Sequence, residues 1–538
     1  ASRLLRTVCA VPTGLAAREM YGKMLGVAFE DYVHAKLIVV WGTNPHATGI
    51  HLVPHVQRAQ KAGTKLVVVD PRRTKLAKRA DLHLPVRPGA DLPLALSVIR
   101  WLFREGRADE AFLARHATGA DALRERAEPW TFERAAVETG IDAAELERFA
   151  ALYADSTPAV VRCGWGLERN RNGGSAASAV MALPAVAGKF GLRGGGYTMS
   201  NSAAWELDAT VAPEAGWGRP INMNLIGREL AERDDPPIAV LFVYNANPLA
   251  TLPNQERVRA GLEREDLFTV VFDQVMTDTA RYADVVLPAT TFLEHTELRR
   301  GYGSTALQMA GPVIEPVGES RPNYAVFADL AKRLDLWRED DVEEPRALAR
   351  AAVGRHADAW RALEEEGIAH FSKGAANGDE PPVQFVDVFP NTPDRKVHLF
   401  SAALDSEAPS GLYGYAPDPG DERHPLALIS PATARTISSS FGQLHPARVA
   451  LELHADDAAA RGIADGDDVR VFNGLGEVRT AARVTTELRP GVVVLPKGLW
   501  SHNTSNGNTS NALVPDTLTD IGGGACFNDA RVEVERLG

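Results

Sequence analysis

The strongest constraint on the fold of this chain is a duplication in its N-terminal part. Each copy contains an apolar run, a turn with the pattern Asn-Pro, a mixed stretch, and a second apolar run that ends in aspartate. The apolar runs are residues 37–41 and 66–69 in the first copy and residues 240–244 and 268–272 in the second. Pro45 and Pro248, Asp70 and Asp273, and Asp81 and Asp284 are each 203 positions apart. One offset kept through separate landmarks indicates an internal repeat.

Each copy has the pattern of a strand, a turn, a helix and a second strand, which predicts a βαβ unit of a parallel sheet. In such sheets ligands bind at the carboxyl ends of the strands, where Asn44, Asp70, Asn247 and Asp273 are expected. For a single unit, helix caps and turns are the simpler interpretation, because Asn and Asp favour those positions. Two units with matched spacing instead favour two nucleotide-like ligands in pseudo-symmetric sites. A nicotinamide dehydrogenase is a weaker alternative, because no Gly-x-Gly-x-x-Gly turn follows the first strand.

Composition and charge narrow the class of protein. The chain has 538 residues, enough for roughly three to four domains. Its formal net charge of -12 argues against a general nucleic-acid-binding surface. No apolar stretch reaches the roughly 20 residues needed to span a bilayer. Cys9, Cys163 and Cys526 are far apart, so this sequence by itself has no set of cysteines that could ligate a 4Fe–4S cluster.

Several short motifs follow one another along the chain in a fixed order. They are Gly42-x-Asn44-Pro45, Val69-Asp70-Pro71-Arg72, Arg87-Pro88-Gly89-x-Asp91, Asn245-x-Asn247-Pro248, Thr277-Asp278-Thr279-Ala280, Ala283-Asp284, Ser438-Ser439, Pro496-x-Gly498-x-Trp500 and Asn511-Ala512-Leu513. Together they resemble the dimethyl sulfoxide reductase superfamily of molybdopterin oxidoreductases. The resemblance covers nearly the whole chain. It implies the catalytic subunit of an enzyme that performs a two-electron redox step, or transfers an oxygen or sulfur atom, on a small-molecule substrate.

The resemblance also implies a cofactor, a pair of molybdopterin guanine dinucleotides that hold one molybdenum or tungsten atom. Two dinucleotides need two βαβ sites, which the repeat supplies. One guanosine end would be held by Asn44, Asp70, Arg72 and Asp91, and the other by Asn247, Asp273, Thr277 and Asp284. Further expected cofactor contacts are Gly42, Gly164, Ser438 and Asn511. An aspartate can accept two N–H bonds from a guanine edge, and an arginine can meet a pyrophosphate.

Cys9 is the expected protein ligand to the metal and the expected catalytic residue. It lies about thirty residues before the first strand, where family members place this ligand, and a thiolate suits molybdenum or tungsten. In other contexts a lone cysteine more often packs in a core, as we expect of Cys163 and Cys526. Ala10 stands where relatives that oxidise formate carry a histidine, which counts against formate as the substrate.

Trp165 is the second residue expected at the active site. It lies in a glycine-rich segment that resembles a loop near the family's active site, so it is expected to line a substrate funnel. An ordinary turn between a strand and a helix explains the same segment equally well.

We therefore predict an α/β protein with two pseudo-symmetric parallel-sheet dinucleotide-binding lobes and a C-terminal β-barrel. The predicted domains are residues 1–195 (first lobe, with Cys9), 196–340 (second lobe), 341–420 (helical insertion and linker) and 421–538 (barrel). An iron–sulfur (4Fe–4S) cluster is expected only in an N-terminal segment missing from this sequence or in an electron-transfer partner subunit. Neither nucleic acid binding nor direct membrane insertion is expected. A cytoplasmic location is favoured, with twin-arginine export to the periplasm as the alternative.

Two alternative functions share the expected fold. One is a structural relative without molybdenum, like the corresponding subunit of complex I, against which Cys9 and two intact sites argue. The other is a hydratase that uses the same cofactor with no net redox change. Nothing in the sequence separates this hydratase from a redox enzyme.

Overall fold

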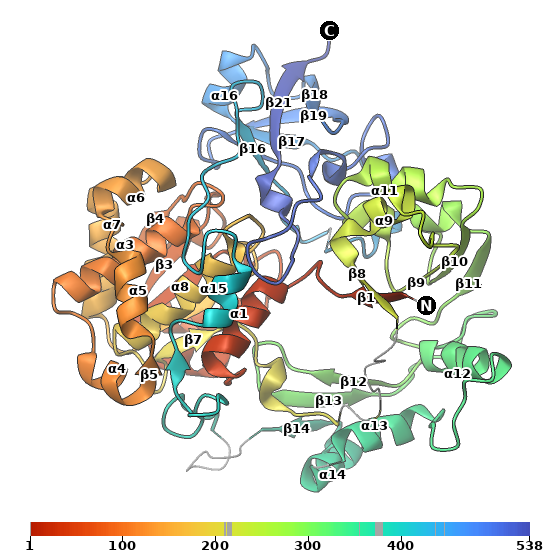
Figure 1. Cartoon of the computed structure of the whole chain (residues 1–538), viewed down its shortest axis with the longest axis horizontal. Coiled ribbons are helices and arrows are strands. Elements are labelled where there is room, and N and C mark those ends of the chain that lie inside the picture. Colours follow the sequence, from red (N-terminus) through yellow and green to blue (C-terminus); the bar gives the residue numbers. More distant parts are fainter. Residues whose placement is uncertain are drawn as a thin grey trace.

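The computed structural model of the chain describes residues 2–208, 211, 218–354, 356–371, 380–435, 437–445 and 447–538. Two α/β lobes lie side by side, and a C-terminal β-barrel packs across both of them (Figure 1). A small antiparallel sheet with two helices adjoins the second lobe. The predicted fold class is therefore confirmed. Among the described helices, none combines the length and the apolar character that crossing a bilayer requires.

The first lobe is built on a five-stranded parallel sheet with the strand order β4-β3-β2-β6-β7. Its strands are β2 (Leu37–Trp41), β3 (Lys65–Val69), β4 (Leu82–Leu84), β6 (Ala159–Cys163) and β7 (Gly196–Thr198). Alternate side chains of β2 enter two different cores. On one face lie α1 (Val11–Tyr21), α3 (Asp91–Arg104) and α8 (Gly173–Val186), and on the other lies α2 (Leu52–Lys61). β7 lies beyond the predicted boundary at residue 195, yet it pairs with β6.

The second lobe repeats part of this sheet. Its strands are β9 (Val240–Tyr244), β10 (Phe268–Asp273) and β11 (Val285–Pro288), in the order β11-β10-β9. They begin at residues 240, 268 and 285, each 203 positions after the first residue of β2, β3 and β4 (37, 65 and 82). The strand register repeats as well, because Leu37 pairs with Lys65 and Val240 pairs with Phe268. The sequence repeat is therefore a structural duplication.

The two sheets differ in how well they are enclosed. β2 lies between β3 and β6 and is buried along its whole length, whereas β9 is an edge strand of its sheet. Val240 at the start of β9 is 62% exposed as a result. Continuous apolar runs are typical of strands buried on both faces. That interpretation holds for the first copy and fails for the second, because the second sheet lacks the counterparts of β6 and β7.

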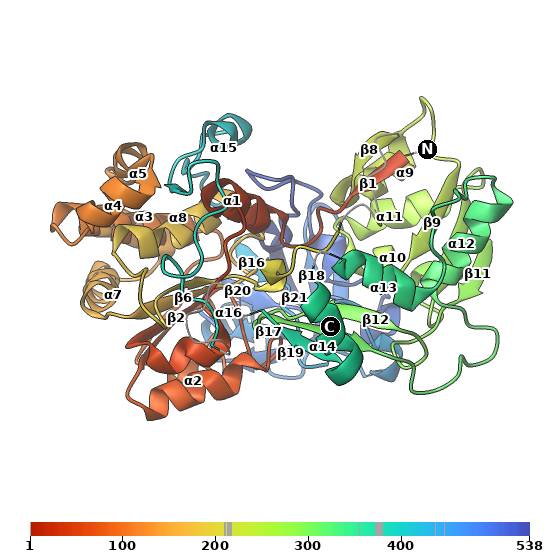
Figure 2. The ribbon, with the colours of Figure 1, turned by 90° about the horizontal axis from the view of Figure 1, so that it is seen from below.

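The N-terminal segment links the two lobes. β1 (Ser2–Leu5) pairs with β8 (Arg219–Asn222) beside α9 (Ile226–Glu232) and α11 (Gln255–Leu262) of the second lobe. The chain then crosses to α1, which packs against α8 of the first lobe. Cys9 lies on this crossing, and Figures 1 and 2 show the crossing in dark red between the lobes.

Residues 297–415 leave the second lobe and return to the first. The small sheet contains β12 (Glu297–Arg300), β13 (Ala306–Ala310) and β14 (Ile368–His370), and the helices that pack against it are α13 (Pro345–Val353) and α14 (Ala357–Glu366). Between β13 and α13 in the chain, α12 (Asn323–Arg333) packs against the sheet of the second lobe through Val326 and Leu330. Residues 372–379 of the expected linker lie outside the described residues. After residue 380 the chain covers the first lobe with α15 (Ala402–Glu407), and β15 (Val397–His398) pairs with β5 (Ala117–Thr118).

The C-terminal domain is a closed barrel with the strand order β16-β20-β17-β19-β18-β21. The strands are β16 (Leu426–Ile429), β17 (Leu451–His454), β18 (Asp468–Phe472), β19 (Glu477–Thr485), β20 (Val492–Val494) and β21 (Arg531–Arg536). Alternate residues of these strands fill the barrel core. The barrel predicted from short β-rich runs is therefore present.

The barrel touches both lobes. On the side of the first lobe, the Arg72 guanidinium lies 3.2 Å from the Glu452 carboxylate. On the side of the second lobe, the Ser501 amide donates to the Asp278 carboxylate at 2.7 Å and the Thr509 amide donates to the Gln255 side chain at 2.9 Å. The polar run 501–511 is thus an ordered interface segment.

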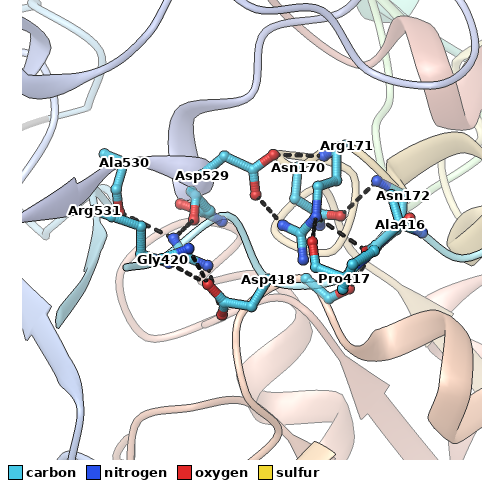
Figure 3. A network of polar contacts seen from close by, with 12 residues as sticks. Asn170, Arg171, Asn172, Ala416, Pro417, Asp418, Gly420, Asp529, Ala530 and Arg531 are labelled. Atoms are coloured by element: carbon cyan, nitrogen blue, oxygen red, sulfur yellow. Dashed lines mark hydrogen bonds and ion pairs between the residues drawn. The ribbon is translucent and has the colours of Figure 1, made fainter. Parts of the chain in front are cut away.

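Buried charges fix the barrel to the loop that follows β6 (Figure 3). The Arg171 guanidinium donates to the Asp529 carboxylate at 2.5 Å, and the Arg171 amide donates to the same carboxylate at 2.8 Å. The Arg531 guanidinium donates to both oxygens of Asp418 at 2.7 and 2.9 Å. Asn172 exchanges hydrogen bonds with the backbone of Ala416. The loop, the linker and the barrel therefore share one polar network.

We expect Asp529→Ala to destabilise the chain by about 3 kcal/mol, because removing one partner of a buried ion pair leaves the other charge uncompensated. The Asp529 side chain is 5% exposed and that of Arg171 is 16% exposed. The measurement is denaturant-induced unfolding. Glu343→Ala is the control, since Glu343 and Lys332 form an exposed pair worth less than about 1 kcal/mol. Equal shifts in the two variants would contradict the assignment.

Candidate functional site

A cavity of about 480 Å³ lies where the two lobes and the barrel meet. It brings together most of the residues predicted from the sequence. These are Cys9, Gly42, Asn44, Asp70, Arg72, Asp91, Trp165, Ser438 and Asn511. Five predicted residues do not line it, namely Gly164 and the four of the second copy, Asn247, Asp273, Thr277 and Asp284.

The ends of β2 and β6 form the floor of the cavity. Gly42 directly follows β2 with a φ of 64°, in the left-handed region that favours glycine. Gly164 directly follows β6, its amide donates to the Trp41 carbonyl at 2.8 Å, and a Cβ atom there would lie 2.4 Å from the Gly42 carbonyl oxygen. Asn245, the counterpart of Gly42 in the second copy, has a φ of 51°. Both copies therefore turn in the same way after their first strand.

Two carboxyl groups of the first copy lie in this site with raised pKa values. Burial raises the pKa of Asp91 to about 7, although the Trp41 indole N–H donates to Asp91 at 2.7 Å. Burial likewise raises the pKa of Asp70 to about 6, opposed by the Arg72 amide, which donates to it at 2.9 Å. Both groups would be stabilised as carboxylates by a ligand that donates N–H bonds to them.

We expect these carboxyl groups to make the chain without bound cofactor less stable as pH rises. Their folded-state pKa values lie above the usual aspartate value of 3.8, so the stability they contribute is full below about pH 4 and is lost as pH rises through 6 to 7. At about 1.4 kcal/mol for each pH unit by which its pKa is raised, Asp91 lowers the free energy of unfolding above pH 7 by up to about 4 kcal/mol. Asp91→Asn should therefore raise the unfolding midpoint at pH 8 and leave it nearly unchanged at pH 4. A variant with the pH profile of the wild type would refute this.

Two amide side chains leave acceptors unused in the cavity wall. The Asn44 Oδ1 and Asn511 Oδ1 atoms are buried and have no hydrogen-bond partner among the described residues. Asn511 is held in place because its Nδ2 donates to the Ala250 carbonyl at 3.0 Å. Buried polar atoms are nearly always bonded, so these two oxygens point to a ligand that carries N–H or O–H donors.

Three predicted residues of the second copy lie at or just after the carboxyl ends of β9 and β10, outside the cavity. The Asn247 side chain accepts from the Thr279 hydroxyl at 2.7 Å, and its Nδ2 is buried without a partner among the described residues. Burial raises the pKa of Asp273, which accepts from the Gln274 amide at 2.7 Å. The Thr277 hydroxyl accepts from the Ala280 amide at 3.1 Å.

Asp284 is committed to the sheet. Its carboxylate accepts from the Thr269 amide at 2.7 Å, as that of Asp81 accepts from the Leu66 amide at 2.8 Å in the first copy. The two aspartates thus join neighbouring strands at matched positions of the repeat.

Cys9 is the exposed cysteine of the three, while Cys163 and Cys526 are buried as expected. Its loop is held by the segment after β6. The Arg169 guanidinium donates to the Val8 carbonyl at 2.5 Å and lies 3.8 Å from Cys9 Sγ. The neighbouring Glu168 carboxylate accepts from the Thr13 amide, in the first turn of α1, at 2.9 Å. In the described part of the chain, no group of three or more His, Cys, Asp or Glu residues could hold a metal ion.

Among the cavity residues that were not predicted from the sequence, three carry a charged or phenolic side chain, namely Arg169, Tyr302 and Lys497. Burial lowers the pKa of Lys497, and the nearby charge of Arg169 lowers it further. Lys497 is the variable position of the motif Pro496-x-Gly498, and Arg169 directly follows the segment that contains Trp165, so both were within reach of sequence reasoning. Tyr302 lies between two glycines far from any motif, and only the fold brings it to the site.

Comparison with known protein families identifies the two main parts of the chain. The family model described as "Molybdopterin oxidoreductase" matches residues 6–333. The model described as "Molydopterin dinucleotide binding domain" matches residues 426–531, which include most of the barrel.

Individual relatives agree with these matches. Probable oxidoreductase YoaE of Bacillus subtilis is 34% identical over 551 residues, covering 100% of this chain and 80% of that protein. Dimethyl sulfoxide reductase DmsA of Escherichia coli is 26% identical, covering 94% of this chain and 72% of that protein. Among solved structures, acetylene hydratase from Pelobacter acetylenicus has a TM-score of 0.77 at 22% identity, covering 98% of this chain and 81% of that one. At this level of identity the likeness shows the fold.

Proposed function

Because this chain belongs to the molybdopterin oxidoreductase family, we propose that it is the catalytic subunit of an enzyme that holds molybdenum or tungsten between two molybdopterin guanine dinucleotides. The observation that carries the proposal is the position of Cys9. It lies in one cavity with strand-end residues of the first repeat copy and with Ser438 and Asn511 of the C-terminal domain. The proposed reaction is a two-electron oxidation or reduction of a small substrate, or the transfer of an oxygen or sulfur atom to or from it.

The residues around the cavity fit such a cofactor. The unpartnered oxygens of Asn44 and Asn511 suit the N–H donors of a guanine or a pterin. Arg72 and Lys497 line the same cavity and carry charges that suit a pyrophosphate. The exposed thiol of Cys9 is a soft ligand of the kind that molybdenum and tungsten accept.

When bound, the cofactor and its metal supply the two-electron chemistry. The residues of the chain would bind and orient the reactants. Cys9 would provide the protein ligand, and Arg169 would hold the Cys9 loop through the Val8 carbonyl. Asp70 and Asp91 would accept N–H bonds from one guanine as carboxylates, which their raised pKa values permit at neutral pH once a donor is present.

The second dinucleotide would bind at the strand ends of the second copy. Asn247 would donate from its free Nδ2, with Asp273 and Thr277 beside it. Asp284 would act indirectly by holding two strands of the sheet together, because its carboxylate already accepts a hydrogen bond from the Thr269 amide. Electrons would reach the site through a 4Fe–4S cluster in a partner subunit or in a segment that this sequence does not include.

The test is elemental and nucleotide analysis of the protein purified from its native host. We expect about one molybdenum or tungsten atom per chain, with two guanine nucleotides released on denaturation. Absence of both metals, in cells whose other molybdoenzymes are loaded, would leave the structural subunit as the better interpretation. A loaded protein that exchanges no electrons with a redox dye, yet hydrates an unsaturated substrate, would favour the hydratase.

A further inference from the structure

Two aromatic residues, one from the first lobe and one from the small sheet, meet at the cavity that contains Cys9. Trp165 comes from the loop after β6, and Tyr302 comes from the turn between β12 and β13. Both line the cavity, and the Trp165 indole N–H donates to the Tyr302 hydroxyl oxygen. Their rings are 6.1 Å apart at an angle of 67°. This contact forms part of the cavity wall on the side of the second lobe.

The turn that carries Tyr302 is fixed against the first lobe. The Asn201 amide donates to the Tyr302 carbonyl at 2.8 Å, and the Phe29 amide donates to the Gly303 carbonyl at 3.3 Å. A Cβ atom on Gly303 would lie 1.9 Å from the Phe29 ring, so the turn approaches that ring as closely as glycine allows. The backbone of Tyr302 therefore holds its side chain in a defined place.

A buried cation lies behind the Tyr302 ring. Arg162 on β6 is 5% exposed, and its guanidinium carbon lies 6.0 Å from the centre of the ring. Arg162 donates to the carbonyls of Cys163, Thr198 and Met199, and in the described part of the chain no ion pair joins it to a carboxylate. Burial raises the pKa of Tyr302, and the nearby charge of Arg162 opposes this larger effect by lowering it. The Arg162 charge polarises the phenol and makes the O–H a better donor.

The Tyr302 hydroxyl can donate its proton to a ligand in the cavity. A phenol oxygen offers one O–H donor and two acceptor lone pairs, and here the Trp165 indole N–H donates to the oxygen. No acceptor among the described residues takes the phenol proton, and Tyr302 lines the cavity and is 48% exposed. Burial raises the pKa of Tyr302 to about 12, so the hydroxyl keeps its proton at neutral pH.

Resting on the proposed function, we propose that Tyr302 contacts the substrate and donates a hydrogen bond to a substrate oxygen placed beside Cys9. This makes Tyr302 a specificity-determining residue for small oxo compounds, in which an S-oxide or N-oxide oxygen carries partial negative charge. The positive charges of Arg162 near the Tyr302 ring and of Arg169 near Cys9 favour the same polarity.

The experiment compares the metal-loaded wild type with Tyr302→Phe, using dimethyl sulfoxide and trimethylamine N-oxide as probes and a reduced viologen dye as electron donor. Removing the hydroxyl should raise KM about three- to tenfold, the effect of one hydrogen bond, and change kcat by less than about twofold. Metal content and the unfolding midpoint should stay at wild-type values. Trp165→Phe removes the donor that fixes the phenol but keeps the hydroxyl, so it should raise KM less. Tyr324→Phe, on α12 and outside the cavity, is the control and should change nothing.

Several results would overturn the inference. Equal KM values for wild type and Tyr302→Phe would show that Tyr302 donates no hydrogen bond to the substrate. Loss of metal in both Tyr302→Phe and Trp165→Phe would show that the pair only holds the lobes together. A metal-loaded wild type that reduces neither probe would show that small oxo compounds are not its substrates. A wild type without molybdenum or tungsten would instead disprove the proposed function itself, and this inference with it.

Discussion

Cys9→Ser is expected to lower turnover at least about 100-fold in the metal-loaded enzyme, beyond the range that loss of a supporting contact around a metal usually costs. The serine oxygen is a harder ligand than a thiolate and donates less charge to the metal. The absorption bands that arise from sulfur-to-metal charge transfer should therefore change as well. The variant should fold normally, because Cys9 is exposed and its loop is held by Arg169 through the Val8 carbonyl.

The measurement is the absorption spectrum together with dye-linked turnover at equal metal content. Ala10→Ser is the matched control, since it adds a hydroxyl at the next position and keeps the thiol. We expect the control to retain the spectrum of the wild type. An unchanged spectrum in Cys9→Ser would show that Cys9 does not bind the metal, and the first-copy residues of the cavity would then need another explanation.

Gly498→Ala is expected to have the second large effect. A Cβ atom at position 498 would lie 1.1 Å from the Ser438 carbonyl oxygen, and the φ of Gly498 is 70°. Ile437 and Ser438 line the cavity, so the segment that must move is part of the cofactor site. We expect a loss of stability of about 2 to 4 kcal/mol, from overpacking and from the left-handed backbone together, and loss of bound nucleotide.

Gly491→Ala separates these two causes. Gly491 is in the same barrel, its φ is 80°, and a Cβ atom there would meet nothing within 4 Å. Gly491→Ala should therefore cost only the 1 to 2 kcal/mol, roughly, of a left-handed alanine and should retain the nucleotide. Unfolding midpoints and nucleotide content measure both effects. Similar nucleotide loss in the two variants would mean that the contact between residues 498 and 438 does not shape the site.

The two repeat copies share a local plan but differ in their surroundings. In both, the strand register, the left-handed residue after the first strand and the aspartate that joins two strands recur at the same offset. Among the described residues, β6, β7 and the barrel segment at Ser438 enclose the first copy alone, and of the two copies only the first has strand-end residues that line the cavity with Cys9. The pseudo-symmetry of the sites is therefore a property of the strand ends and does not extend to the cavity.

The sequence by itself determined where the first two strands of each repeat copy lie and that a β-barrel forms the C-terminal part. Apolar runs, turn residues and a constant offset are local signals, and a strand is specified mainly by the alternation and burial of its own side chains. Asn44 and Asp70 could be predicted as site residues for the same reason, because the carboxyl ends of parallel strands lie at one edge of a sheet. Asp91 follows only from the family resemblance.

Only the tertiary structure decided which residues surround Cys9. Arg169, Tyr302 and Lys497 come from a loop after β6, a turn of the small sheet and the barrel, and no local pattern records that these segments meet. The same holds for the raised pKa of Asp91, which arises because distant segments exclude water from it. Burial and long-range contacts depend on the path of the whole chain, whereas periodicity and turn chemistry depend on neighbours in sequence.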